Sequence, residues 1–183
     1  MDGTDGANPT DGEDGRNVKL LIQGDARFAG TTTVWGQDGG RGGDGTVSGN
    51  TDQMVTGGKG GDGGNIRVLV TGNLVYEVNQ TPPQGESPSN IIRSGAGGRG
   101  GDATATATTN PGNGAKGPNA TAKGGNGGAP GLIQVQALGG VNAVGSGLTF
   151  QIGELGRGGN AIANGAAGAD ASATQAAQEG GDA

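Results

Sequence analysis

The chain has no cysteine, no histidine and very few aromatic residues: one tryptophan, one tyrosine and two phenylalanines among 183 residues. The first two absences exclude disulfides, zinc sites built on Cys or His, and nucleophile pairs of those residues. The third excludes an ordinary apolar core. We therefore predict a non-enzymatic protein with no catalytic residue, no metal site and no cofactor. A glycosidase-like pair among Glu77, Glu86, Glu154 and the aspartates is the remaining enzyme hypothesis, but no spacing singles out two of them.

The balance of charge and the lack of long apolar runs narrow the partners further. A net charge of −6 with a pI near 4.5 excludes nucleic acid, because a phosphate backbone requires a basic surface. No apolar run approaches the roughly 18 residues of a membrane-spanning helix, so we expect no membrane span. The start, Met1 to Thr4, does not resemble a signal peptide. We interpret Met1 as an expression start on an excised mature segment, and expect an extracellular or cell-surface location.

Glycine is the commonest residue, with 46 in the chain, and such a composition is typical of disorder. The apolar residues, however, are concentrated in alternating blocks, each closed by a glycine, and in each unit a second apolar stretch leads into a Gly-rich exit. These exits begin at Arg41, Arg99 and Arg157, which are 58 and 58 residues apart. Equal spacing predicts a structural repeat. We predict one repeat domain of 1–183, with units of about 10–56, 57–123 and 124–183.

Alternation with β-branched residues indicates strands, and the Gly-containing steps after them indicate turns. We expect strands at 17–23, 65–71 and 132–138, each followed by a turn and a second strand, as short β-hairpins. The alternating Ala and small polar residues at 103–108 and 169–174 predict two further extended arms, an Ala-rich helix being the alternative for the second.

The glycine tracts have a three-residue period: in Gly57 to Asn65 every third residue is not glycine. Polyproline II has three residues per turn and a rise of about 3.1 Å, so such a tract places its non-glycine side chains in one line. Its bare edges allow neighbouring backbones to hydrogen-bond, whereas a flexible linker would need no triplet register. The predicted fold class is mainly β with polyproline-II (polyglycine II) helices, stacked like a solenoid. The predicted structural glycines are Gly39, Gly40, Gly42, Gly43, Gly57, Gly58, Gly60, Gly61, Gly63, Gly64, Gly100, Gly101, Gly158 and Gly159.

Charged residues recur beside these glycines at equivalent places, and we expect them to form ion pairs that fix the register of the helices. They are Arg41, Arg99, Arg157, Asp38, Asp44, Asp62 and Asp102. Calcium is the less favoured hypothesis. Loose binding by Asp2, Asp5, Asp11, Glu13 and Asp14, or by Asp38 and Asp44, stays open because hard cations accept carboxylate oxygens without strict spacing. The β-roll calcium repeat is matched at 39–44, 57–62 and 97–102, but its large apolar eighth residue is missing. The N-terminal acids are interpreted as a solvated surface.

Two groups of residues are candidates for recognition. The four aromatic residues, Phe28, Trp35, Tyr76 and Phe150, fall in strand blocks, where core packing is favoured over a carbohydrate platform. The insertion at 80–89 is rich in turn formers, and insertions in repeats map to loops on one face. Its candidate recognition residues are Gln80, Gln84, Glu86 and Ser87.

The run at 57–70, a Gly-Gly-Lys-Gly-Gly-Asp-Gly-Gly-Asn tract that leads into an alternating strand, resembles the Gly-rich N-terminal fold of the Obg GTPases. It is also similar to repeats of large secreted bacterial glycine-rich proteins. The Gly-X-X pattern is similar to that of springtail antifreeze proteins and of phage tail-fibre adhesins. The resemblance implies architecture; this chain has neither a GTPase domain nor the disulfides of small springtail antifreezes.

Three functions are open from the sequence. The first is an extracellular structural or surface-scaffold module of a matrix, filament or adhesin, which associates with itself or with a surface glycan or protein. The second is a receptor-binding adhesin tip that presents loops. The third is ice binding, for which Thr31 to Thr33, Thr104, Thr106 and Thr108 are the candidates.

Overall fold

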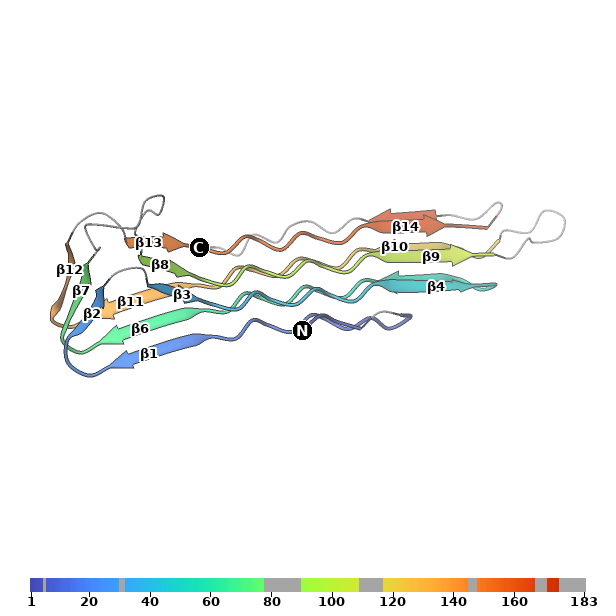
Figure 1. Cartoon of the computed structure of the whole chain (residues 1–183). Helices are drawn as coiled ribbons and strands as arrows, with labels where there is room; N and C mark the ends of the chain where they lie inside the picture. Colours follow the sequence, from blue (N-terminus) through green and yellow to red (C-terminus); the bar gives the residue numbers. More distant parts are fainter. Residues whose placement is uncertain are drawn as a thin grey trace, which may run out of the picture.

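The computed structural model shows an elongated molecule in which a central bundle of extended segments joins two regions of β-structure (Figure 1). The structure describes residues 1–4, 6–29, 32–77, 90–108, 117–144, 148–166 and 171–174. Within them there is no α-helix, and so no helix that could cross a membrane. The chain passes along the bundle repeatedly, reversing direction at each end.

Fifteen short strands lie at the two ends. They are β1 (Val18–Ile22), β2 (Ala26–Ala29), β3 (Thr33–Trp35), β4 (Gly45–Gly49), β5 (Gln53–Thr56), β6 (Ile66–Val70), β7 (Asn73–Glu77), β8 (Asn90–Arg93), β9 (Ala103–Ala107), β10 (Ala120–Lys123), β11 (Ile133–Ala137), β12 (Gly140–Val144), β13 (Leu148–Gln151), β14 (Ala161–Asn164) and β15 (Ala171–Thr174).

The strands form five parallel sheets of three, and each sheet takes one strand from each successive layer of the chain. At one end lie the sheets β1-β6-β11, β2-β7-β12 and β3-β8-β13, and at the other lie β4-β9-β14 and β5-β10-β15. Val18 pairs with Ile66, and Ile66 with Ile133. The predicted equivalence of the strands at 17–23, 65–71 and 132–138 is therefore confirmed, as is the repeating, mainly β fold class.

The expected hairpins are wrong in their pairing. The turns at Gly24, Gly72 and Gly140 do join consecutive strands, but those strands belong to different sheets. Gly24 and Gly140 have φ of 91° and 125°, a region that glycine enters without steric cost. The turn chemistry signals a reversal or a corner equally. The pairing is parallel because an equivalent strand of the next layer lies alongside each strand and offers a full row of backbone partners.

The glycine tracts between the strands run as polyproline-II helices in two facing rows. One row contains 36–44, 94–102 and 152–160, with residues 1–4 at its edge, and the other contains the tract before β1, 57–65 and 124–132 (Figure 1). Within the described tracts, the backbone bonds connect separate segments at three-residue intervals. This pattern is what the triplet register predicts.

The apolar side chains form two separate cores. The larger lies inside the three-sheet end, where Ile66, Val68, Val70, Leu74 and Ile92 are buried with Tyr76 and Ala26. The smaller lies between the two sheets at the other end and consists mostly of alanine: Ala103, Ala105, Ala107, Ala120 and Ala122, with Val55. The extended arm at 103–108 is thus confirmed in β9, with its alanines inward. The described part of the second arm, β15, is also extended.

Core packing is right for two of the four aromatic residues and wrong for the other two. Phe28 and Tyr76 stack with ring centroids 5.4 Å apart, since they are opposite each other in β2 and β7. Trp35 and Phe150, in contrast, are 64% and 51% exposed. Trp35 is paired with Arg93 and lies on the outer side of β3, whereas Phe150 is paired with the buried Ile92 and lies on the inner side of β13.

Candidate functional site

The bundle turns its glycines inward and shows its other side chains on two outer faces. Gly60, Gly61 and Gly63 are buried, whereas Lys59 and Asn65 in the same tract are exposed. A Cβ at any of the predicted structural glycines except Gly158, which is half-buried, would lie closer than 3.0 Å to backbone atoms of neighbouring segments. The interior is therefore backbone packed on backbone.

Two of the three N–H groups in each triplet bond to the backbone. The first glycine donates within its own row of helices: Gly42 N–H bonds to the Arg99 carbonyl at 2.8 Å and Gly100 N–H to that of Arg157 at 2.8 Å. The second glycine donates to the facing row. These bonds continue through the whole bundle as Gly156 to Gly128, Gly128 to Gly98, Gly98 to Gly61, Gly61 to Gly40, and Gly40 to Glu13, at 2.7–2.9 Å.

The third N–H, on the non-glycine residue, bonds to a side chain of the preceding layer wherever the equivalent residue there is Asp or Asn. Asp14 Oδ1 accepts from Asp62 N–H at 2.8 Å, and Asp62 Oδ1 accepts in turn from Ala129 N–H at 2.9 Å. Nine further bonds have this form; their acceptors are Asp2, Asp11, Asn17, Asp25, Asp38, Asp44, Asp52, Asn65 and Asp102. We call these eleven side chains the Asx ladder. Where this acceptor is present, every N–H of the triplet is satisfied.

The Asx ladder corrects the interpretation of the N-terminal acids as a merely solvated surface. Asp2, Asp11 and Asp14 each accept a backbone N–H of the following layer. A signal for this was present in the sequence, because Asp and Asn recur at the non-glycine place of the triplets. Sequence reasoning missed it because side chains of that place were assigned only to ion pairs or to a solvated surface.

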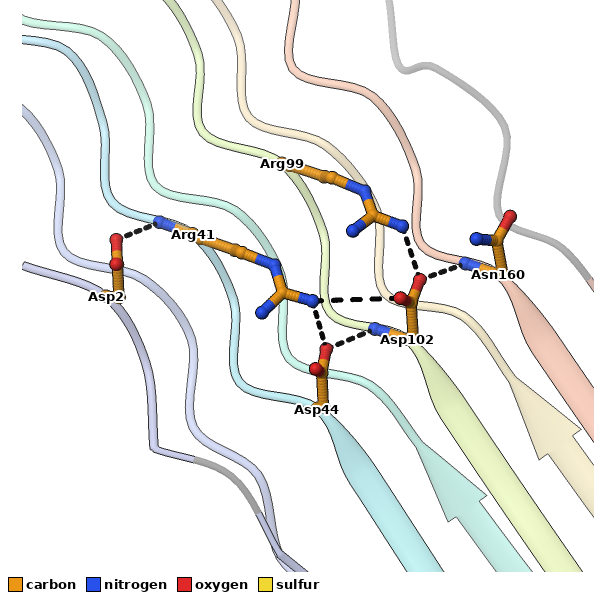
Figure 2. A network of polar contacts seen from close by, with 6 residues as sticks. All are labelled: Asp2, Arg41, Asp44, Arg99, Asp102 and Asn160. Atoms are coloured by element: carbon orange, nitrogen blue, oxygen red, sulfur yellow. Dashed lines mark hydrogen bonds and ion pairs between the residues drawn. The ribbon is translucent and has the colours of Figure 1, made fainter.

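The predicted register residues do meet in part (Figure 2). Arg41 reaches Asp44 at 2.5 Å and Asp102 at 3.7 Å, and Arg99 reaches Asp102 at 2.6 Å. On the opposite face Asp62 pairs with Lys59 at 3.4 Å. Asp38 holds the N–H of Ala96 at 2.7 Å. No ion pair of Arg157 is seen in the described residues, because Asn160 takes the place that Asp44 and Asp102 occupy in the earlier layers.

This network changes the pKa of the Asp44 carboxyl. Burial raises its pKa, but the hydrogen bonds from Arg41 and from the N–H of Asp102, with the charges of Arg41 and Arg99, lower it by more. The pKa therefore lies below its usual 3.8. Because the folded-state pKa is the lower one, ionised Asp44 stabilises the fold at neutral pH, and this contribution is lost as the pH falls through the lowered pKa.

The arrangement suits holding segments in place more than it suits chemistry. In the described residues, no three carboxylates gather where a metal ion would be held. The candidate recognition residues Gln80, Gln84, Glu86 and Ser87 lie outside the described residues, as does Thr31. Thr104 and Thr106 are half-buried on the outer side of β9, and Thr108 is exposed.

Comparison with known proteins adds little to this geometry. Neither a family model nor a curated protein sequence matches the chain. One solved structure, described as the nine polyproline type II helical bundle springtail antifreeze protein from Granisotoma rainieri, is 24% identical over 91% of this chain and 93% of that one. Its TM-score of 0.20 is too low to carry an argument, so the bundle described here rests on its own hydrogen bonds.

Proposed function

We propose that the chain is a non-enzymatic, extracellular surface-scaffold module that associates with a second copy of itself. The backbone-bonded bundle supports the scaffold role, because it holds the two sheet regions apart and its interior is backbone packed on backbone. The proposal depends above all on one observation, the change of character in the last layer of the repeat.

The last layer is apolar at places where the earlier layers are polar. Leu132 stands where the Asx ladder has Asn17 and Asn65. Ile162 stands where β4 and β9 have Thr46 and Thr104. Leu132, Leu138, Ile152 and Ile162 are all more than half exposed. Several exposed apolar side chains along one layer favour an interaction surface on that layer.

The inward side chains of this layer are also open. Val141 pairs with Leu74, and Phe150 with Ile92. Leu74 and Ile92 are 0% and 3% exposed, whereas Val141 and Phe150 are 58% and 51% exposed. Solenoids need a polar cap over their last repeat, and the described residues provide none here.

A second copy fits this surface through the same layer. Two last layers that meet across a twofold axis would cover each other's open core, as an isologous interface does. They would also pair the edges of β11 to β13 that no other described strand covers. The first layer is a poorer counterpart, because residues 1–4 already lie along 36–44, where Gly3 N–H bonds to the Arg41 carbonyl at 2.6 Å.

Light scattering after size-exclusion chromatography tests the proposal. We expect the mass of the wild-type protein to rise toward that of a dimer with increasing concentration, and Phe150→Glu to remain monomeric because it places a charge at the centre of the interface. Trp35→Glu is the matched control, since it changes an exposed aromatic at the other edge of the same sheet. A monomeric wild type, or equal behaviour of the two variants, would contradict the proposal.

Ice binding is the second candidate, and one specific feature favours it. Thr46 pairs with Thr104, and Ser48 with Thr106, so four hydroxyls form a grid about 4.8 Å apart between strands and about 6.6 Å apart along them. A fixed grid of hydroxyls on a rigid support can order water. Wild-type protein would then show thermal hysteresis in a freezing assay, and Thr104→Tyr would abolish it. Absence of hysteresis in the wild type removes this candidate.

A further inference from the structure

The only tryptophan of the chain, Trp35, lies where the three-sheet end meets the bundle. It is the last residue of β3 and is 64% exposed. Leaving so large an aromatic surface in water is costly, and an exposed tryptophan is among the commonest anchors of a binding surface.

A hollow of about 350 Å³ adjoins this side chain. It is lined by Trp35, Gly36, Gln37, Asp38 and Arg93, and its size is within the range of small-molecule sites. The lining combines one aromatic surface with an amide, a carboxylate and a guanidinium. These polar groups offer both hydrogen-bond donors and acceptors.

The walls of the hollow are held by hydrogen bonds to the backbone. Gly36 N–H bonds to the Arg93 carbonyl at 2.8 Å, which ties the first layer to the second. Asp38 is fixed through Oδ1 by the N–H of Ala96 at 2.7 Å, and Gln37 Oε1 accepts from Arg16 N–H at 3.3 Å. A site built on such fixed elements loses little conformational entropy when a ligand binds.

Arg93 and Asp38 line the same hollow without pairing. No salt bridge of Arg93 is found among the described residues, whereas Arg41 and Arg99 are both paired with aspartates. The Oδ2 atom of Asp38 is not used in its bond to Ala96. A donor and an acceptor therefore both line the hollow beside the tryptophan, and their opposite charges sum to zero.

We propose that this hollow is a carbohydrate-binding subsite that takes a neutral hexose unit. The C–H groups on one side of a pyranose ring would stack on the face of Trp35, whose quadrupole attracts them. Its hydroxyls would donate to Asp38 and accept from Arg93. The cancelled charge favours a neutral sugar over a polyanion, and the polar lining disfavours an apolar ligand. This inference goes beyond the scaffold role and does not depend on self-association.

The sole tryptophan makes its own reporter. Trp35 emission is followed while cellohexaose, chitohexaose, maltohexaose or a heparin oligosaccharide is added to the whole chain. We expect a saturable change with at least one neutral oligosaccharide and none with heparin. Asp38→Asn and Arg93→Gln should each weaken that binding about tenfold or more, equivalent to about 1.4 kcal/mol.

Calorimetry with Trp35→Ala completes the test, because that variant has no tryptophan signal. Binding should be lost in Trp35→Ala and kept in Met54→Ala, which removes a 77% exposed side chain at the other end of the molecule. Unchanged thermal melts of both variants show that folding is not the cause. The proposal is overturned if no neutral oligosaccharide changes the emission, if heparin alone binds, or if Trp35→Ala still binds.

Discussion

Replacing Gly61 with valine is expected to lower the free energy of unfolding by about 3 kcal/mol, because overpacking and lost backbone hydrogen bonds act together. A Cβ at Gly61 would lie closer than 3.0 Å to the carbonyl of Glu13 and to the carbonyl oxygen of Gly12. Both are backbone groups, which cannot rotate away as a flexible side chain would. Gly61 also donates to Gly40 and accepts from Gly98, each at 2.8 Å. A shift of the Gly61 backbone therefore disturbs both rows of helices.

Lys59→Ala is the matched control in the same tract. Its side chain makes one exposed ion pair with Asp62 at 3.4 Å, so its removal should cost about 0.5 kcal/mol or less. Urea titrations of the two variants measure the difference. Equal midpoints would show that the tract behaves as a linker. Asp62→Ala is no substitute control, since Asp62 also accepts the N–H of Ala129.

Asp102→Ala is expected to lower the free energy of unfolding by about 1–2 kcal/mol, because it leaves a backbone N–H without its acceptor. Oδ1 of Asp102 accepts the N–H of Asn160 at 2.6 Å and bonds to Arg99 at 2.6 Å. The side chain is 36% exposed, so solvent screens the ion pairs and most of the loss comes from the N–H.

Asp102→Asn separates those two contributions. It keeps an oxygen for the N–H of Asn160 but removes the charge that Arg41 and Arg99 contact, so it should cost about 0.5 kcal/mol or less. Asn already occupies this place in the last layer, at Asn160. If the alanine and asparagine variants were equally destabilised, the carboxylate charge would matter and the Asx ladder would not.

The sequence predicts the bundle well, because the triplet period of glycine has a direct physical meaning. The two residues of each triplet that face neighbouring backbones must lack a Cβ. The positions of Gly60, Gly61 and Gly63 therefore predict how the tract packs. The strands at β1, β6 and β11 were equally accessible from alternation. Their equal place in successive layers followed from the repeat spacing.

Strand pairing and the Asx ladder were harder to predict, because both depend on which segments lie side by side. The turn at Gly24 fits a hairpin as well as a corner, and only the neighbouring layer decides. Likewise Asp14 accepts an N–H from a residue 48 positions away. The exposure of Trp35 was also hidden, because alternation in a three-residue strand does not say which side is inward.

The distance along the chain between bonded partners has a kinetic consequence. In the bundle, the Asx bonds join residues mostly 48, 58 or 67 positions apart, and the described tracts have no helix-like local bonds that could form first. Each segment must therefore meet a partner far along the chain before it forms stabilising hydrogen bonds, and closing such loops costs conformational entropy. Folds dominated by distant contacts form slowly. The same connectivity slows unfolding, because no single tract can leave without breaking hydrogen bonds to both rows of helices. The persistence of the scaffold would then be set by its low rate of unfolding.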